Sequence, residues 1–289
     1  MKAKYLMLNG EFVPADKACL SARNRGLLYG EVYSMVMRAC SSKVYFFENY
    51  YNKLLQELAE TGIPKPALMN EKMLEHDIYL LLQKCRIYKG ANVRITVFRN
   101  ENESFYVTNT LGSSVIIEIE HNHCENYTLN EIGLRVAVAE FMKLPNLKPP
   151  FRISPNALGF TQLSEYFNEY QADSFLLINN DDLLIQAPDG NVVFVAGNQA
   201  LIPGFSRLYT HDVLMEPLEE ALQNAGLKLL YDAEIRPRDL INVDEVYIID
   251  SLHGIRWVQA FGEKRFYHRY AVVVNKCLVD IATKSLQLQ

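Results

Sequence analysis

"DEVYIIDSLHGIRWV", residues 244–258, holds two apolar segments separated by a short polar turn. Both segments are rich in β-branched and aromatic residues, which are enriched in strands, so the stretch predicts two strands. The only tryptophan of the chain, Trp257, lies in the second segment, whose residue types alternate. We therefore predict that Trp257 belongs to the core.

The residues before and after this stretch continue the pattern. "SFLLINNDDLLIQ" (174–186) predicts two strands joined by a polar turn, and "GNVVFVAGNQALI" (190–202) predicts two more. A helix is predicted over residues 216–225, where Gly226 follows, and another over 268–284. The second half of the chain is therefore expected to be rich in strands.

The N-terminal half combines strands with two amphipathic helices. Residues 4–13 predict a hairpin, because the Asn-Gly pair in "NGEF" favours a two-residue turn. One helix is predicted over residues 49–61, which a glycine and a proline follow, and a second over 67–86. The remaining predicted strands of this half cover residues 32–40, 43–48, 91–99 and 113–120.

The polar segment "HNHCENYTLNE" (121–131) has few residues that could form a core, and we interpret it as a linker. It divides the chain into domains at residues 1–120 and 132–289. Clustered strands with helices between the clusters predict two α+β domains. His121 and His123 resemble half of a metal site, but no neighbouring cysteine or carboxylate cluster completes it, so no metal site is predicted.

The bulk composition excludes several classes of function. The net charge is −5 with both signs interspersed, whereas nucleic-acid binding requires a basic face. No apolar run approaches the roughly 18–20 residues of a membrane span. The five cysteines are widely spaced without a CxxC pair, which favours reduced thiols and a cytoplasmic location.

Three segments of the first 160 residues resemble motifs of the class IV aminotransferases. "NRGLLYGEVYSMVMR" (24–38) is similar to N-R-x-x-x-Y-G-D-G-x-F-E-x-x-R. "FFENYYNKL" (46–54) is similar to H-x-x-R-L, and "PNALGF" (155–160) is similar to the end of K-T-x-N-A-L.

Three later segments follow the same family in order. "LLIQAPDGNVVFV" (183–195) is similar to I-x-E-x-x-x-x-N-x-F-x-V, and residues 200–222 have the length and hydrophobicity of the T-P…G-I-T-R region. Residues 244–258 are similar to A-D-E-x-F-x-T-x-x-x-G-I-x-x-V. The order and spacing of the motifs carry the resemblance, which covers nearly the whole chain.

This family comprises pyridoxal-phosphate (PLP) proteins of fold type IV, including branched-chain and D-amino-acid aminotransferases and aminodeoxychorismate lyase. The resemblance implies an α+β, two-domain fold like that of D-amino-acid aminotransferase. It implies a small N-terminal α/β domain, a larger C-terminal mixed domain resembling a β-barrel, and PLP between them. It also implies a homodimer.

The lysine that forms the Schiff base in the family has no clear counterpart. Counting back from Asn156 reaches Ile153, or Arg152 with a shift of one residue. Isoleucine has no nucleophile, and arginine stays protonated. Lys148 is a surrogate candidate that would reach the position only if its proline-rich loop refolded.

The acid that faces the pyridine nitrogen in the family becomes Gln186, five residues before Asn191. Glutamine can hydrogen-bond a ring nitrogen but lacks the negative charge that keeps it protonated.

The phosphate-binding G-I-T-R positions become Asp212, Val213, Leu214 and Met215. Acidic residues at the start of a helix suit the helix dipole. The same charge repels a phosphate, so this region is predicted to have lost the anion site.

On the basic side of the site, Lys53 replaces the family's arginine and Tyr50 replaces its histidine. Lys53 is interpreted either as a phosphate ligand or as part of the exposed face of a helix. Ser251 stands where the family has a threonine that meets the phosphate. The positions equivalent to the family's cofactor-binding positions are Lys53, Asn156, Gln186, Asn191, Val213, Leu214 and Ser251.

The main hypothesis is a class IV aminotransferase homologue that has lost PLP and ordinary transamination and binds another small molecule in the interdomain cleft. One alternative is an active PLP-dependent aminotransferase or lyase with an atypical site. Another is chemistry without PLP that uses Tyr50, Lys53 or Arg152.

Overall fold

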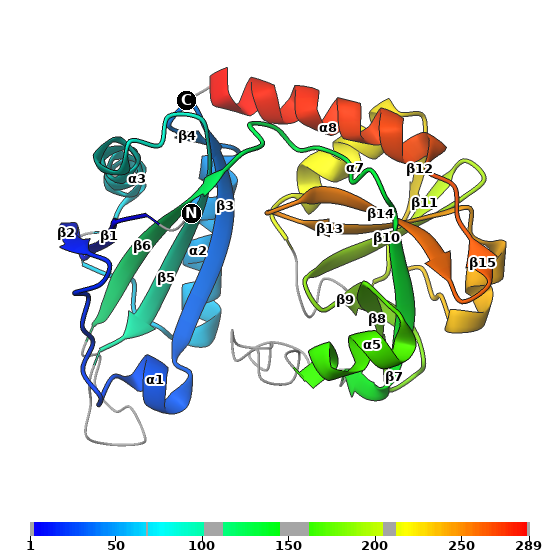
Figure 1. Cartoon of the computed structure of the whole chain (residues 1–289), viewed down its shortest axis with the longest axis horizontal. Helices are drawn as coiled ribbons and strands as arrows, with labels where there is room; N and C mark the ends of the chain where they lie inside the picture. The colour runs from blue at the N-terminus through cyan, green and yellow to red at the C-terminus, as the bar shows by residue number, and fades with distance from the viewer. Residues whose placement is uncertain (1–2, 68, 101–111, 145–161, 205–211, 288–289) are drawn as a thin grey trace. The chain divides into compact units, whose positions relative to one another are not determined.

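The computed structural model describes residues 3–67, 69–100, 112–144, 162–204 and 212–287 (Figure 1). The chain forms two compact units. Unit 1 contains the residues up to Asn126 together with the C-terminal residues from Ser285, and unit 2 contains the described residues from Tyr127 to Lys284.

Unit 1 is built on one six-stranded sheet in the order β2-β1-β6-β5-β3-β4, with every neighbouring pair antiparallel. Its strands are β1 (Tyr5–Leu8), β2 (Glu11–Pro14), β3 (Val32–Cys40), β4 (Lys43–Val44), β5 (Gly90–Arg99) and β6 (Ser113–Asn122). The predicted Asn-Gly turn is confirmed: Asn9 and Gly10 both have positive φ between β1 and β2.

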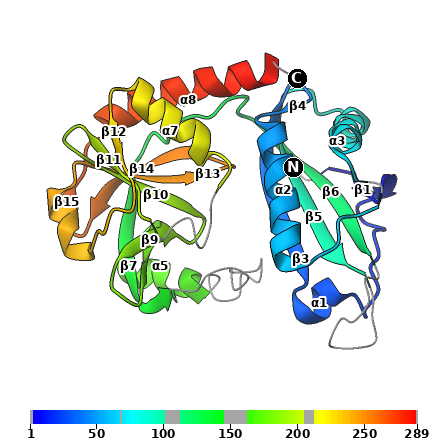
Figure 2. The same cartoon turned by 180° about the vertical axis from the view of Figure 1, so that it is seen from behind.

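The described residues of unit 1 include the helices α1 (Arg25–Tyr29), α2 (Phe47–Thr61) and α3 (Glu71–Cys85). Figure 2 shows α2 lying across the sheet. The cross-strand pairs Met35–Ile95 and Met37–Val93 are buried on the helix-covered face.

Two element boundaries differ from the predictions by four residues. The strand predicted over 43–48 ends at Val44, because Phe46 has a positive φ of 54° and α2 begins at the next residue. The helix predicted over 67–86 begins at Glu71, because the Asn70 side chain accepts a hydrogen bond from Met73 N and caps it.

Unit 2 contains a closed barrel. Consecutive strands pair in the order β10-β13-β14-β7-β8-β9, and β9 pairs back with β10. The strands of this unit are β7 (Leu134–Leu144), β8 (Ser174–Asn179), β9 (Leu184–Ala187), β10 (Gly190–Ala196), β11 (Gln199–Leu201), β12 (Lys228–Leu230), β13 (Glu245–Asp250), β14 (Gly254–Phe261) and β15 (Lys264–Arg265). The barrel agrees with the expected architecture of the second domain.

Apolar residues from every barrel strand pack together; Val192, Phe194, Ile248 and Val258 are each at most 1% exposed. Around the barrel lie the helical elements η1 (Gln162–Tyr166), α5 (Phe167–Tyr170), α7 (Met215–Asn224), η2 (Pro237–Asn242) and α8 (Arg269–Gln287).

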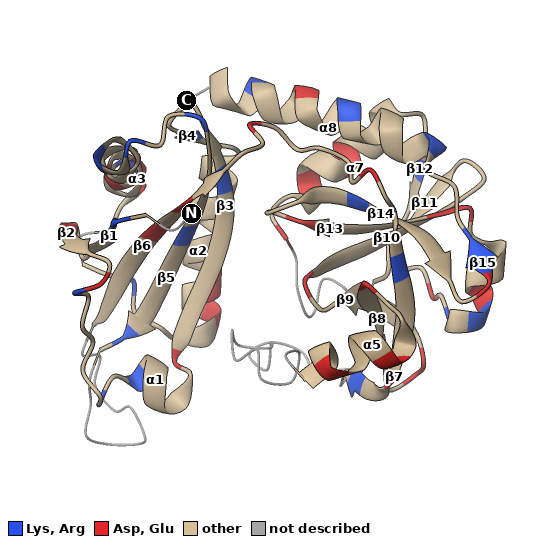
Figure 3. Ribbon diagram, in the orientation of Figure 1, with Lys and Arg blue, Asp and Glu red and all other residues tan. Residues whose placement is uncertain are grey.

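Both strands predicted from residues 244–258 are present, as β13 and β14. Trp257 is buried, as predicted, and its ring stacks on His268. Figure 3 shows that both units contain Lys and Arg as well as Asp and Glu positions along the ribbon, as the interspersed charges of the sequence predict.

The segment predicted as a linker is more ordered than its composition suggests. Its first two residues, His121 and Asn122, continue β6 and pair with β5. Tyr127 is only 2% exposed, and a side chain at Gly254 would collide with its ring. The tyrosine therefore belongs to the core of unit 2.

Gly190 closes the barrel between β9 and β10, and we expect Gly190→Ala to destabilise unit 2 by about 2–3 kcal/mol. A β-carbon there would collide with the backbone carbonyl of Ile249, which the sheet holds in place. Chemical denaturation measures the loss. Gly197→Ala is the comparison, because Gly197 has a φ of 57° but a β-carbon at this position would meet no atom within 4 Å. An equal effect of the two substitutions would contradict this assignment.

Candidate functional site

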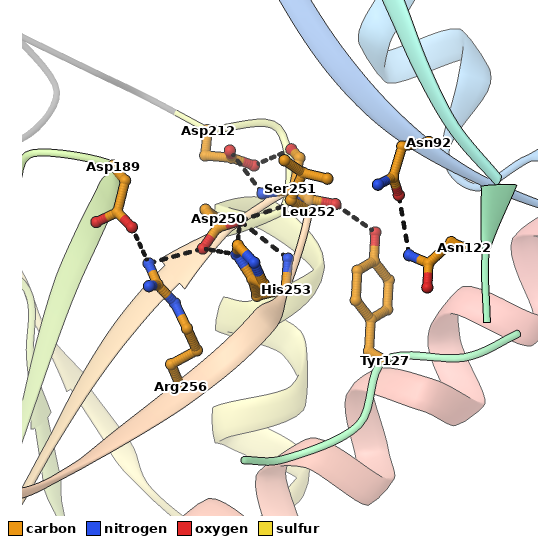
Figure 4. A network of polar contacts seen from close by, with 10 residues as sticks. All are labelled: Asn92, Asn122, Tyr127, Asp189, Asp212, Asp250, Ser251, Leu252, His253 and Arg256. Carbon is orange, nitrogen blue, oxygen red and sulfur yellow. Dashed lines mark hydrogen bonds and ion pairs between the residues drawn. The ribbon is translucent and has the colours of Figure 1, made fainter. Parts of the chain in front are cut away.

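The side-chain carboxylate of Asp212, which precedes α7 in the sequence, accepts hydrogen bonds from several donors (Figure 4). It accepts from Ser251 N at 2.9 Å, from Ser251 Oγ at 2.5 Å and from Leu214 N at 2.8 Å. The donors come from two places far apart in sequence: the turn after β13 and the residue that precedes α7. We call these three donors the anion cup.

Asn191 holds the backbone at the entrance of this turn. Its side-chain Oδ1 accepts a hydrogen bond from Asp212 N at 3.0 Å, and the residue is fully buried. Asn191 lies on β10 opposite Ile249 of β13, so one strand pair supports both sides of the anion cup. The asparagine retained from the family pattern therefore positions the acidic side chain.

Asp212 is electrostatically unusual. Burial raises the pKa of its carboxyl above the ordinary value, and nearby Asp250 raises it further, while the donors from Ser251 and Leu214 oppose these effects. The donors match a carboxylate, which accepts hydrogen bonds through both oxygens.

Asp250 and the side chains that contact it hold the turn that carries Ser251. Asp250 Oδ1 accepts hydrogen bonds from Leu252 N, His253 N and His253 Nδ1, each at 2.9 Å. Arg256 Nη2 lies 2.9 Å from Asp250 Oδ2 and donates to Asp189 Oδ2 at 2.6 Å. These contacts fix the turn after β13 and therefore the direction of the Ser251 donors.

This cluster predicts a dependence of stability on pH. Burial alone would raise the pKa of Asp250, but the hydrogen bond from His253 and the charge of Arg256 outweigh it and hold the pKa below its ordinary value. A lowered pKa gives stability that is present above the unfolded-state value and lost as the pH falls through the folded-state value. We expect the stability advantage of the wild-type chain over Asp250→Asn to shrink below about pH 4. Urea midpoints of both proteins between pH 3 and pH 7 measure it, and a constant difference would contradict the lowered pKa.

Gln186 lies on the same sheet face as Asn191, because the two residues are partners in the β9–β10 pair. Its side chain is 1% exposed, and its Oε1 accepts no hydrogen bond from the described part of the chain. The residue predicted to replace the family's acid is therefore buried and uncharged, and its Oε1 has no partner among the described residues.

Lys53 is neither exposed nor unpaired, which corrects the prediction of an exposed helix face. Its side chain is 13% exposed, and Nζ lies 2.8 Å from Glu57 Oε1 one turn further along α2. Neighbouring Tyr50 is 2% exposed. Both residues belong to unit 1, whereas the anion cup belongs to unit 2.

The remaining predicted positions have distinct outcomes. Val213 and Leu214 are both buried. Among the described contacts, the backbone N of Leu214 donates a hydrogen bond to the Asp212 carboxylate, whereas Val213 does not. Met215, which is predicted to replace the family's arginine, is the first residue of α7 and is 1% exposed. Lys148, Arg152, Ile153 and Asn156 lie outside the described residues.

The retained N-terminal motif has a structural explanation. Asn24 caps α1 by accepting a hydrogen bond from Leu27 N, and buried Arg25 forms two hydrogen bonds with Glu31, at 2.9 and 2.6 Å. Arg99 forms an ion pair with the same carboxylate at 2.8 Å. These contacts connect α1 to the sheet of unit 1. They give Asn24 and Arg25 a structural role that does not depend on a cofactor.

The cluster of Asp189, Asp250, His253 and Arg256 was not predicted from the sequence. A sequence signal existed only for the turn "DSLHG", where an aspartate precedes Ser251 and a glycine follows it three residues later.

The possible metal site at the histidine pair gains no support. The rings of His121 and His123 do contact each other, with centroids 4.6 Å apart. No group of three or more potential metal ligands occurs in the described ranges. None of the helices described there is long and apolar enough to span a membrane.

The family model for amino-transferase class IV matches residues 36–261. The chain belongs to the class IV aminotransferase family. A putative branched-chain-amino-acid aminotransferase of Methanocaldococcus jannaschii is 21% identical over 244 residues, covering 84% of this chain and 83% of the relative. A probable branched-chain-amino-acid aminotransferase of Rickettsia bellii is 22% identical over 227 residues, covering 78% and 76%.

Two solved structures share the fold. The branched-chain aminotransferase of Thermoproteus uzoniensis, solved with norvaline, has a TM-score of 0.84 at 15% identity and covers 99% of this chain and 98% of its own. A putative 4-amino-4-deoxychorismate lyase from Legionella pneumophila has a TM-score of 0.79 at 16% identity and covers 93% and 97%. The predicted family and two-domain fold class are confirmed.

Proposed function

We propose that this class IV aminotransferase homologue does not carry out PLP-dependent transamination and binds a different small molecule in place of PLP. The observation that carries the proposal is the carboxylate of Asp212 in the anion cup. Ser251 and Leu214 stand at positions that meet the cofactor phosphate in the family, and both donate to Asp212. The donors that would hold a phosphate are already engaged.

Electrostatic repulsion also disfavours a phosphate in the anion cup. Two unit charges about 4 Å apart repel by about 4 kcal/mol at an effective dielectric constant near 20. A phosphate could enter the anion cup only if the Asp212 side chain moved out of it or took up a proton from solvent. The described residues therefore do not fit the phosphate of PLP.

Gln186, the predicted partner of the pyridine nitrogen of PLP, supports the same conclusion. An electron-accepting pyridine ring depends on an anionic partner for its protonated nitrogen, and glutamine has no charge. Gln186 is buried at that position, and no acidic residue replaces it on β9.

One observation favours the alternative, an active PLP enzyme with an atypical site. The unsatisfied Oε1 of Gln186 is a hydrogen-bond acceptor that a ligand N–H would satisfy. An assay separates the two functions: the purified chain with PLP, an amino-acid donor and a 2-oxo acid acceptor. We expect no turnover above the rate of PLP alone, and turnover would favour the active enzyme.

We also propose a homodimer, as the family resemblance implies. Short helix α1 exposes Leu27 by 73%, Leu28 by 53% and Tyr29 by 43%. Clustered exposed apolar side chains are typical of protein interfaces. The molar mass from light scattering tests the proposal, and a value near 33.2 kDa would contradict it.

A further inference from the structure

Unit 1 contains a cavity that has no part in the proposed function. It lies between the β1–β2 turn, the start of β6 and the N-terminal part of α3, and its volume is about 470 Å³. This volume lies within the roughly 300–1,000 Å³ of small-molecule sites. We call it the α3 groove.

The floor of the α3 groove is apolar. Met69, Leu74 and Val115 line it and are 4%, 2% and 8% exposed. Met73, also in the lining, is 40% exposed. Methionine side chains adapt to the shape of a bound apolar group, so this lining suits an aliphatic ligand body.

The charged side chains among the described lining residues, Asp77 and Glu11, are both acidic. The Asp77 side chain makes no hydrogen bond or ion pair with any described residue. Burial raises the pKa of its carboxyl, and the charge of neighbouring His76 opposes this effect without cancelling it. No cation contacts the Asp77 carboxylate among the described residues, and a bound cation would stabilise its charged form.

The other polar groups of the groove are already engaged. Asn9 accepts a hydrogen bond from Val115 N at 2.9 Å and donates to Ser114 Oγ at 3.1 Å, and Ser113 Oγ donates to Pro64 O. Lys84, further along α3, lies over the rings of Tyr5 and Phe12 at 4.9 and 5.6 Å. The charged groups that can meet a ligand in the described groove are therefore the carboxylates of Asp77 and Glu11.

We propose that the α3 groove binds a small organic cation, with a primary ammonium group at Asp77 and an aliphatic chain against Met69 and Leu74. The inference uses residues of unit 1 alone and is independent of the proposed loss of PLP.

Titration of the full-length protein with hexylammonium tests the proposal, with hexanol as the neutral comparison and hexanoate as the anionic one. Calorimetry gives the affinities, and the ¹³C-methyl resonances of Met69 and Met73 report the location. We expect hexylammonium to bind about tenfold more tightly than hexanol, because one charge-assisted hydrogen bond contributes about this factor to the affinity. Hexanoate should not bind.

Asp77→Asn removes the charge and preserves the shape, so it should abolish the preference for hexylammonium. Glu75→Gln is the matched control, because Glu75 is exposed on the same helix and does not line the groove. Equal affinities of the wild-type protein for hexylammonium and hexanol, no saturable binding, or an unchanged affinity in Asp77→Asn would each overturn the proposal. If Asp77→Asn fails to fold, the comparison of the three ligands on the wild-type protein decides.

Discussion

Asp212→Gly is expected to create a phosphate site that the wild-type chain lacks. The substitution introduces the glycine that the motif resemblance predicts for this position, and it leaves Ser251 N, Ser251 Oγ and Leu214 N without their acceptor. Unsatisfied buried donors cost about 1–3 kcal/mol each, so the variant should be less stable than the wild type in phosphate-free buffer. Inorganic phosphate should then recover stability, since a ligand at about 100 times its Kd contributes about 2.7 kcal/mol.

Thermal melting of both proteins with increasing phosphate measures this effect, with sodium chloride at matched ionic strength as the control. The melting temperature of Asp212→Gly should rise by several degrees, while that of the wild type stays constant. The double variant Asp212→Gly, Ser251→Ala loses one donor and should respond less. Equal responses of the wild type and Asp212→Gly would mean that the anion cup is not an anion site.

Glu245→Ala is expected to destabilise unit 2 by about 3 kcal/mol or more. The buried carboxylate accepts hydrogen bonds from Tyr247 Oη at 2.6 Å, Tyr270 N at 2.9 Å and Ala271 N at 3.0 Å. It therefore joins β13 to the start of α8, and its charge suits the positive end of the helix dipole. Removing the carboxylate leaves three donors without an acceptor, and each unsatisfied buried donor costs about 1–3 kcal/mol of stability. Water that enters the space recovers part of this cost.

Chemical denaturation of three variants beside the wild type tests this role. Tyr247→Phe removes one of the donors and should cost about 1 kcal/mol. Glu263→Ala is the control, because Glu263 is exposed and lies in the turn between β14 and β15. A Glu245→Ala variant as stable as Glu263→Ala would show that the carboxylate does not hold α8.

The local elements of the fold follow from sequence because their signals are local. The Asn-Gly turn and the two strands of residues 244–258 depend on turn chemistry and residue type within a few positions. Closure of the barrel through the β9–β10 pair could not be predicted in this way. Pairing between strands depends on how the whole sheet packs, and no periodicity within one strand specifies its partner.

The site shows the same limit. The acidic character of the α7 start was predicted from Asp212, but its bonds to Ser251 join residues 39 positions apart and depend on tertiary packing. Lys53 shows the opposite case: its partner Glu57 is four residues along the same helix, and this ion pair was readable from the spacing.

Loss of PLP is the central proposal, and an absorbance titration of the purified protein with PLP tests it most directly. Borohydride reduction and peptide mass mapping of the same sample then report any covalent adduct. We expect no imine band at roughly 410–430 nm and no reduced lysine. A band in that range, together with a modified lysine at position 148 or elsewhere, would contradict the loss of PLP and identify the lysine that anchors it.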